Sequence, residues 1–415
     1  MSDTHLPMLL NLPRAREIMA LEQIDGLIAC LPINVYYLSG YWGLLMSAER
    51  FDASFFAVLP NSEEHPAALV LPSMELRRLV AQGGSWMPET FIFTRPGDEH
   101  DHIAVEGLPY DGWPIRQDAE LTSLEKRGIE ATRSQVGRTS GNARGALARA
   151  VRAAGLERAH VISDDARVAG WLESAGLTQM QCREDANVFN RIRLVKTEAE
   201  LKLMRKAALI NEASARESAA AFRDGADWPE IESVYAAAMA AEGARASYLM
   251  CGAGGPRNGR LQPGEPMFID ALGTYAQYHG DFGRCVVIGE ADKLTRQRHA
   301  ALVAGWHAAA EFLRPGVRYS ELAEAAVSAV RAAGMPEFVY ATPHSLGLEH
   351  TDDPKIVGGQ QGMTTDIMLE EDMVLNVDMP FTEIGWGSVH IEDTVQITAS
   401  GFETLTSDDL DIIEV

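Results

Sequence analysis

The stretch Met267-Phe-Ile-Asp-Ala-Leu-Gly-Thr-Tyr-Ala-Gln-Tyr-His-Gly-Asp-Phe-Gly-Arg-Cys-Val-Val-Ile-Gly289 predicts two strands joined by a turn. Each strand carries one aspartate, Asp270 or Asp281, and Asp270 ends the apolar run that begins at Met267. A carboxylate at the edge of a core is costly unless it is paired or bound to a cation. Two carboxylates converging from a hairpin favour a hard-oxygen metal site. An aspartate at a strand end is also a common turn former, so the pair alone leaves both interpretations open.

Three further residues with side chains that can bind a metal ion follow along the chain. His344 lies in Pro-His-Ser-Leu-Gly-Leu-Glu-His, Asp378 ends an apolar run, and Glu392 lies in Ser-Val-His-Ile-Glu-Asp-Thr-Val. Taken singly, each fits a structural role, such as a hydrogen-bonded core histidine or a solvated strand end. Taken together, one imidazole and four carboxylates predict a metal centre.

This ordered set resembles the creatinase/aminopeptidase-P/methionine aminopeptidase superfamily, the "pita-bread" metallohydrolases, whose ligands run Asp, Asp, His, Glu, Glu. Further residues match the motifs around those ligands: Tyr278, Arg284, Gly347, Leu348, Ile391 and Asp393. The resemblance implies two divalent metal ions, with Mn²⁺ favoured and Co²⁺ or Zn²⁺ as substitutes. It implies five metal ligands: Asp270, Asp281, His344, Asp378 and Glu392. It also implies three catalytic residues: His344, Asp378 and Glu392.

Several positions depart from the family pattern. Asp378 stands where the family has Glu, Gly283 where it has Thr, and Ser345 follows the histidine as it does in creatinase. The loop from Cys251 to Leu261 lacks the histidine that the family's peptidases carry upstream of the first Asp.

Three residues are candidates for binding substrate. Arg257 and Arg260 have the geometry to hold a substrate carboxylate bidentately, or they are solvated loop charges. His350 lies one position short of the family's substrate-binding histidine.

The resemblance implies a dinuclear hydrolase that cleaves a C–N bond with a metal-bridging hydroxide, most simply an Xaa-Pro dipeptidase acting on a small peptide or amide. One alternative is a metal-free, creatinase-like amidinohydrolase, or another non-peptidase small-molecule hydrolase or lyase on the same fold. A second alternative is a catalytically silent binding module.

The length of 415 residues favours two domains. Strands alternate with helices over the first part, which predicts an α/β domain at 1–185. The stretch Asp25-Gly-Leu-Ile and the segment Pro32-Ile-Asn-Val-Tyr-Tyr-Leu-Ser-Gly40 resemble the N-terminal domain of creatinase. Thr197-Glu-Ala-Glu200 is a capping box that begins a long helix of the second domain, at 186–415. The fold class is therefore α/β (α+β): a creatinase-like domain followed by a pita-bread domain.

Composition limits the partners. The net charge of −23 argues against nucleic acid and anionic membranes. No apolar run approaches the roughly 20 residues of a membrane span, and the first residues do not resemble a signal peptide. Four scattered cysteines indicate reduced thiols in a cytoplasm. The resemblance adds the expectation of a homodimer.

Overall fold

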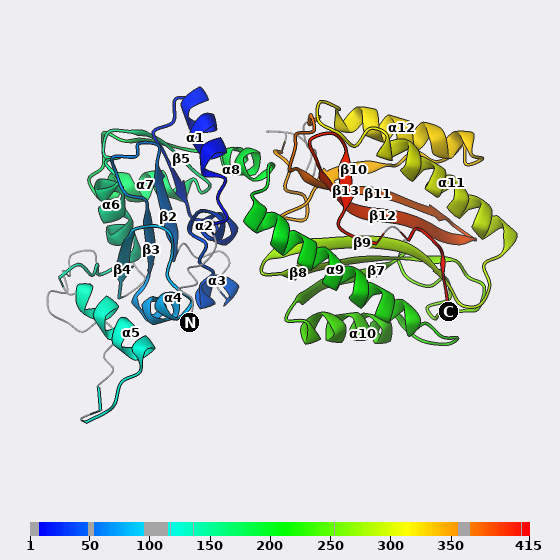
Figure 1. Ribbon diagram of the computed structural model, residues 1–415, viewed down its shortest axis with the longest axis horizontal. Coiled ribbons are helices and arrows are strands. Elements are labelled where there is room, and N and C mark those ends of the chain that lie inside the picture. Colours follow the sequence, from blue (N-terminus) through cyan, green and yellow to red (C-terminus); the bar gives the residue numbers. More distant parts are fainter. Residues whose placement is uncertain are drawn as a thin grey trace. The chain divides into compact units, whose positions relative to one another are not determined.

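The computed structural model describes residues 8–48, 54–94, 115–116, 118–135, 137–252, 254–355, 366–407 and 409–415. The chain forms two compact units, Met1–Ile192 and Arg193–Val415 (Figure 1). Their junction falls within helix α8 (Ala186–Arg193), the helix that begins where the sequence predicts the second domain to start.

The first unit is built around a six-stranded mixed sheet with the strand order β4-β3-β2-β1-β5-β6. Its strands are β1 (Gly26–Ala29), β2 (Phe56–Pro60), β3 (Ala68–Pro72), β4 (Glu89–Phe93), β5 (His160–Ser163) and β6 (Gln181–Glu184). The first three are buried at every position, as expected of strands covered on both faces. Besides α8, the described residues of this unit form α-helices α1 (Leu12–Leu21), α2 (Pro32–Ser39), α3 (Leu44–Ala48), α4 (Leu76–Ala81), α5 (Ser123–Ser134), α6 (Ala143–Ala153) and α7 (Arg167–Ser174).

The segment with the creatinase-like motif forms α2. Pro32 stands in its first turn, where a missing N–H costs nothing. Gly40 ends the helix with φ 73°, a left-handed conformation that favours glycine. The motif is thus a short, buried helix whose two ends are fixed by backbone chemistry.

The second unit contains an eight-stranded sheet (Figure 1). Six strands follow the order β10-β11-β12-β9-β8-β7, while β13 pairs with β12 and β14 with β9. The strands are β7 (Arg245–Cys251), β8 (Met267–Tyr275), β9 (Tyr278–Val287), β10 (Thr342–Ser345), β11 (Val374–Glu383), β12 (Gly387–Ile397), β13 (Phe402–Thr404) and β14 (Ile413–Glu414). The helices are α9 (Glu198–Ala220), α10 (Trp228–Ala241), α11 (Lys293–Ala310) and α12 (Tyr319–Ala332).

The predicted hairpin is confirmed as β8 and β9, paired from Met267↔Val286 to Tyr275↔Tyr278. The two turn residues, Ala276 and Gln277, have φ values of 49° and 70°. Two positive φ values in a two-residue loop match the twist of the flanking strands. The turn therefore fixes the register that places both aspartates.

Strand alternation separates two kinds of side chain in this sheet. Apolar residues that alternate with the candidate ligands along β8, β9, β11 and β12 belong to the buried cores that α9 to α12 help to form: Ile269, Ala271, Phe282, Val377, Met379, Ile391 and Val395. Because successive strand residues point to opposite faces, the candidate ligands face away from those cores.

The predicted start of the long helix is also confirmed. The Thr197 hydroxyl accepts a hydrogen bond from the Glu200 backbone N–H, and the Glu200 carboxylate accepts one from the Thr197 backbone N–H. This reciprocal pair satisfies two N–H groups that the first turn of a helix leaves without partners.

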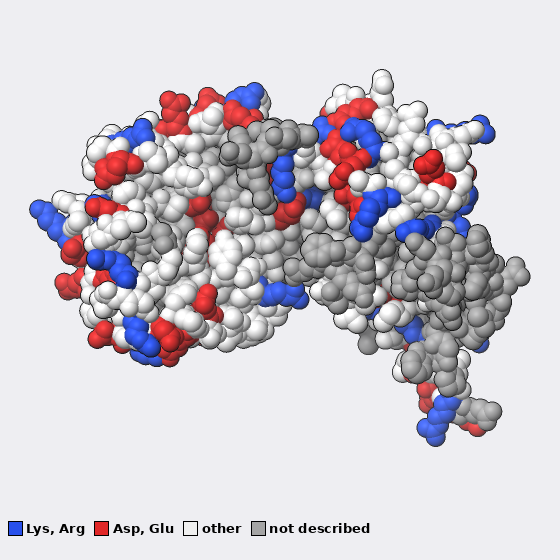
Figure 2. Space-filling view, turned by 180° about the vertical axis from the view of Figure 1, so that it is seen from behind, with Lys and Arg blue, Asp and Glu red and all other residues white. Residues whose placement is uncertain are grey.

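Surface charge is mixed in sign. Figure 2 shows acidic side chains spread over the described part of one face and interspersed with basic ones. Among the described residues, no helix has the length and apolarity that a bilayer crossing requires.

Candidate metal centre

The strand register aligns three predicted ligands across four neighbouring strands. Asp270 on β8 lies opposite Gly283 on β9, Gly283 lies opposite Glu392 on β12, and Glu392 lies opposite Asp378 on β11. Directly opposed residues share a face of the sheet. The row therefore presents three carboxylates on one face, with a glycine among them.

The other two predicted ligands lie on the same face. Asp281 is two residues from Gly283 on β9. Every second residue of a strand points to the same face of the sheet, so Asp281 shares the face of Gly283. His344 on β10 lies opposite Asn376, which is two residues before Asp378 on β11. The fold thus brings all five predicted ligands to one face of one sheet.

Most of these polar side chains are buried, and some of their atoms have no hydrogen-bond partner among the described residues. Asp281, His344 and Glu392 are all buried, and Asp270 is half-buried. Among the described residues, several of their atoms have no hydrogen-bond partner: Oδ1 of Asp270, Oδ1 of Asp281, Oε2 of Glu392 and Nδ1 of His344. Buried carboxylate oxygens without donors are costly, and bound cations remove that cost. The donor set fits divalent metal ions.

Burial and neighbouring negative charges raise the pKa values of two of these carboxyl groups. Burial, with the neighbouring charge of Asp281, raises the pKa of Asp270 to about 7. Burial and the charges of Asp281 and Asp270 hold the pKa of Glu392 well above its ordinary value. The carboxylates therefore raise one another's pKa values, and bound cations would offset that repulsion.

Two groups of potential ligands lie within this face. In the first group, Nε2 of His350 lies 3.1 Å from Oδ2 of Asp281, and Nε2 of His344 lies 4.0 Å from the same oxygen. The two imidazole rings are 4.8 Å apart between centroids. His350, predicted as a substrate-binding residue, therefore lies among the candidate ligands.

The second group consists of Asp270, His390 and Glu392. The sequence prediction missed His390, although strand alternation places it two residues before Glu392 on the same face. Its Nε2 lies 2.7 Å from Oδ1 of Asp378 and 3.8 Å from Oε2 of Glu392. Burial lowers the pKa of His390, but the hydrogen bond to Asp378 and nearby negative charges raise it more, so the net shift is upward.

A buried ion pair beneath the face holds β9 to β12. The Arg284 guanidinium donates to Oδ1 of Asp393 at 2.7 Å and to the Glu392 backbone oxygen at 2.8 Å. Thr406 donates a hydrogen bond to the same Asp393 oxygen. These contacts fix the backbone from which Glu392 projects.

A second buried pair holds the segment that carries His344 and His350. Asp352 accepts hydrogen bonds from Arg193 at 2.6 Å and from Lys196 at 3.4 Å. A Cβ at Gly347 would lie 2.3 Å from Oδ2 of Asp352, so the segment can approach this pair only with glycine there.

The arginine candidates lie on the surface loop after β7. A guanidinium nitrogen of Arg257 donates to the Trp386 backbone oxygen at 3.4 Å. A guanidinium nitrogen of Arg260 donates to the Gly225 backbone oxygen at 2.8 Å and lies 3.9 Å from Asp227. Neither of these contacts involves a candidate metal ligand, and a substrate-binding role stays a prediction.

A cavity of about 690 Å³ lies beside β7 and is lined in part by Tyr248 and Met250. Met250 lies opposite Asp270 and Tyr248 opposite Leu272, so both share the face of the carboxylates. Burial raises the pKa of Tyr248, and the charges of Asp270 and Asp281 raise it further. The cavity therefore offers an apolar surface close to the centre.

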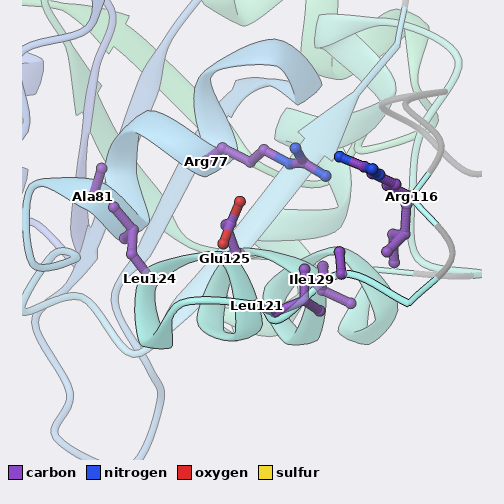
Figure 3. Close-up of a pocket in the computed structure, with 10 residues that line it drawn as sticks. Arg77, Ala81, Arg116, Leu121, Leu124, Glu125 and Ile129 are labelled. Carbon is purple, nitrogen blue, oxygen red and sulfur yellow. The ribbon is translucent and has the colours of Figure 1, made fainter.

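The first unit contains a separate cavity of about 440 Å³ between α4 and α5. Figure 3 shows the guanidinium groups of Arg77 and Arg116 pointing toward one another, with Glu125 projecting from α5 and apolar side chains lining the rest. The charged side chains labelled in this cavity are two arginines and one glutamate, whereas the candidate metal centre of the second unit consists of carboxylates and imidazoles.

Comparison with known families divides the chain in the same way. Residues 202–399 match the family described as Metallopeptidase family M24. Residues 12–132 match the Creatinase/Prolidase N-terminal domain.

Among curated proteins, Probable dipeptidase PepE of Mycobacterium tuberculosis (strain ATCC 25618 / H37Rv) is 33% identical over 229 residues, covering 52% of this chain and 59% of PepE. Xaa-Pro dipeptidase of Pyrococcus furiosus is 24% identical over 238 residues, covering 55% and 67%. The similarity thus spans less than two thirds of the length of PepE.

Solved structures share the whole fold. Xaa-Pro dipeptidase from Bacillus anthracis superimposes with a TM-score of 0.70 at 17% identity, covering 97% of this chain and 99% of that one. The prolidase from Pyrococcus horikoshii OT3 gives 0.66 at 20% identity, covering 96% and 99%. The predicted fold class, a creatinase-like domain followed by a pita-bread domain, is confirmed.

Proposed function

Since the chain is a two-domain member of metallopeptidase family M24, we propose that it is a dinuclear metal-dependent hydrolase cleaving the C–N bond of a small peptide, most simply an Xaa-Pro dipeptide. The observation that carries this proposal is the single sheet face that gathers four carboxylates and His344. The names of the relatives support the choice of substrate class.

The ions would be held by five residues: Asp270, Asp281, His344, Asp378 and Glu392. When bound, two divalent cations lower the pKa of a water between them and polarise the carbonyl of the bond to be cleaved. Mn²⁺ suits a donor set dominated by carboxylates, and Co²⁺ or Zn²⁺ suits its imidazole.

We assign the movement of a proton to Asp378. It is partly exposed, whereas Glu392 opposite it is buried, so Asp378 can exchange a proton with substrate or solvent. Nε2 of His390 lies 2.7 Å from its Oδ1. We assign Asp378 the transfer of a proton to the leaving amine, a role typically worth 10²–10⁴-fold in rate.

The substrate's apolar part would lie along β7. Tyr248 and Met250 border the adjoining cavity on the face of the carboxylates. Such a surface suits a prolyl ring or an aliphatic side chain, because cavities of this kind bind ligands mainly through apolar contact.

The test is a panel of Xaa-Pro dipeptides, other dipeptides, and guanidino and amide compounds, assayed with Mn²⁺-loaded enzyme. We expect cleavage of Xaa-Pro dipeptides, with kcat for Asp378→Asn lower by about 10²-fold or more because the proton carrier is lost. Asp378→Glu restores the family residue and should retain more activity than Asp378→Asn.

Two outcomes would contradict the proposal. Turnover of guanidino compounds alone, without added metal, would support the creatinase-like alternative instead. Equal kcat for wild type, Asp378→Asn and Asp378→Glu on a cleaved dipeptide would remove Asp378 from the mechanism.

A further inference from the structure

Gly283 occupies the middle of the carboxylate row, and the space above it is filled by His390. A Cβ built on Gly283 would lie 2.3 Å from Cε1 and 2.4 Å from Nδ1 of His390, and 2.9 Å from Cβ of Glu392. Real Cβ atoms do not approach other atoms so closely. The imidazole can therefore take this position only because residue 283 has no side chain.

The ring of His390 is fully buried and held from two further sides. Phe268 packs against it edge-on, with ring centroids 4.9 Å apart. Its Nε2 points to Oδ1 of Asp378 at 2.7 Å and lies 3.8 Å from Oε2 of Glu392. Packing and geometry thus aim one ring nitrogen at the carboxylates.

The donor spacing fits one metal ion. Ligand atoms offered by Asp270, His390 and Glu392 lie within 4.8 Å of one another. Metal–nitrogen and metal–oxygen bonds of about 2.0–2.2 Å separate neighbouring donors on one ion by roughly 3 Å. Oε2 of Glu392 and Oδ1 of Asp270 are buried and have no hydrogen-bond partner among the described residues. Small shifts would bring the three donors onto one cation.

We propose that His390 is a metal ligand of the second cation position, together with Asp270 and Glu392, and that Gly283 makes the room for it. Each position then has imidazole: His344 and His350 beside Asp281, and His390 beside Asp270. This inference rests on the proposed metal centre, and it goes beyond the ligand set implied by the family resemblance, which contains one histidine.

The competing role for His390 is purely structural, as a hydrogen-bond partner that orients Asp378. In that role its loss would alter turnover but would leave the ligands of the ions unchanged. Counting the imidazoles bound to metal therefore separates the two roles.

The experiment uses the full chain loaded with Co²⁺. Equilibrium dialysis with elemental analysis gives the ions bound per chain and their affinities, and X-ray absorption gives the imidazoles per ion. For wild type we expect two ions with imidazole on both. For His390→Ala we expect one imidazole fewer per chain and a second ion bound at least about 10-fold more weakly, the scale on which even supporting groups of metal sites act.

Gly283→Ala should reproduce the His390→Ala result, because its Cβ displaces the ring. If Gly283 acts through His390, adding Gly283→Ala to His390→Ala should weaken the second ion little further, as a double-mutant cycle reveals. His307→Ala is the matched control, since His307 is an exposed histidine on α11. It should leave both affinities and the imidazole count unchanged.

The outcomes are distinct. Two ions with an unchanged imidazole count and unchanged affinities in folded His390→Ala would overturn the inference and leave the metal centre standing. No bound ion in wild type would overturn the proposed function itself. If Gly283→Ala does not fold, wild type and His390→Ala decide the question between them.

Discussion

Glu200 is the clearest single residue at which burial controls ionisation. It is 1% exposed, accepts hydrogen bonds from the Thr197 N–H and the Tyr278 hydroxyl, and has its pKa raised to about 7, mainly by burial. Between its unfolded pKa near 4.5 and about 7, the folded chain holds a proton that the unfolded chain has lost. Stability from this group is therefore present below about pH 4.5 and is lost as pH rises through 7.

We predict that Glu200→Gln flattens this pH dependence, because glutamine cannot ionise and still completes a capping box. The difference in free energy of unfolding, variant minus wild type, should be larger at pH 7.5 than at pH 5, by on the order of 3 kcal/mol at most. Urea denaturation at both pH values measures it. Glu198→Gln, an exposed change in the same helical turn, is the control. The same difference from wild type at both pH values would show that Glu200 ionises normally.

At the level of single residues, the sequence predicted the candidate ligands that stand in family motifs, and it did not point to His390, which we propose as a further ligand. Asp270, Asp281 and Glu392 are recognisable from neighbours along the chain. His390 depends on Gly283, more than a hundred residues away and opposite it only through the β9–β12 register. The contact between these two residues cannot be predicted until the register of the strands is known.

At the level of elements, β9 lies unusually close to α9. A Cβ on Gly280 would lie 2.5 Å from the Ala207 backbone oxygen and 2.8 Å from Cβ of Asn211. Asn211 in turn donates a hydrogen bond to the Ala271 backbone oxygen on β8 at 2.7 Å. The helix thus holds the hairpin whose strands carry Asp270 and Asp281.

We predict that Gly280→Ala forces α9 away from the hairpin and lowers the free energy of unfolding by roughly 1–3 kcal/mol, the usual cost of an added methyl in a tight contact. Gly401→Ala is the matched control in the same unit, since a Cβ there meets no atom within 4 Å. Chemical denaturation of the two variants and wild type measures the effect. Equal losses for both variants would mean that the β9–α9 contact is not the constraint.

Elements themselves were largely predictable, because their signals are local. The hairpin, the capped helix α9 and the alternation of the first unit all follow from patterns within about 25 residues. The segment around Asn34 was harder: Val35, Tyr36 and Tyr37 have β propensity, but Pro32 and Gly40 close it as helix α2. Helix α5 was not predicted, although its Thr122–Glu125 capping box was a visible signal.

At the level of the whole molecule, one sheet face gathers the polar residues and the opposite face builds the cores. That division explains how four carboxylates, two of them buried, can share one face of a stable domain: the strand register places them, and cations would neutralise them. The homodimer and the cytoplasmic location stay predictions.

The central claim is that this face holds two divalent cations. The most direct measurement is elemental analysis of the 415-residue chain after dialysis against Mn²⁺, beside Glu392→Gln as the variant that removes a carboxylate charge from the centre. We predict two ions per wild-type chain and fewer than two for the variant, with both proteins folded by circular dichroism. A folded wild-type chain that holds no ion at saturating Mn²⁺, Co²⁺ or Zn²⁺ would contradict the account.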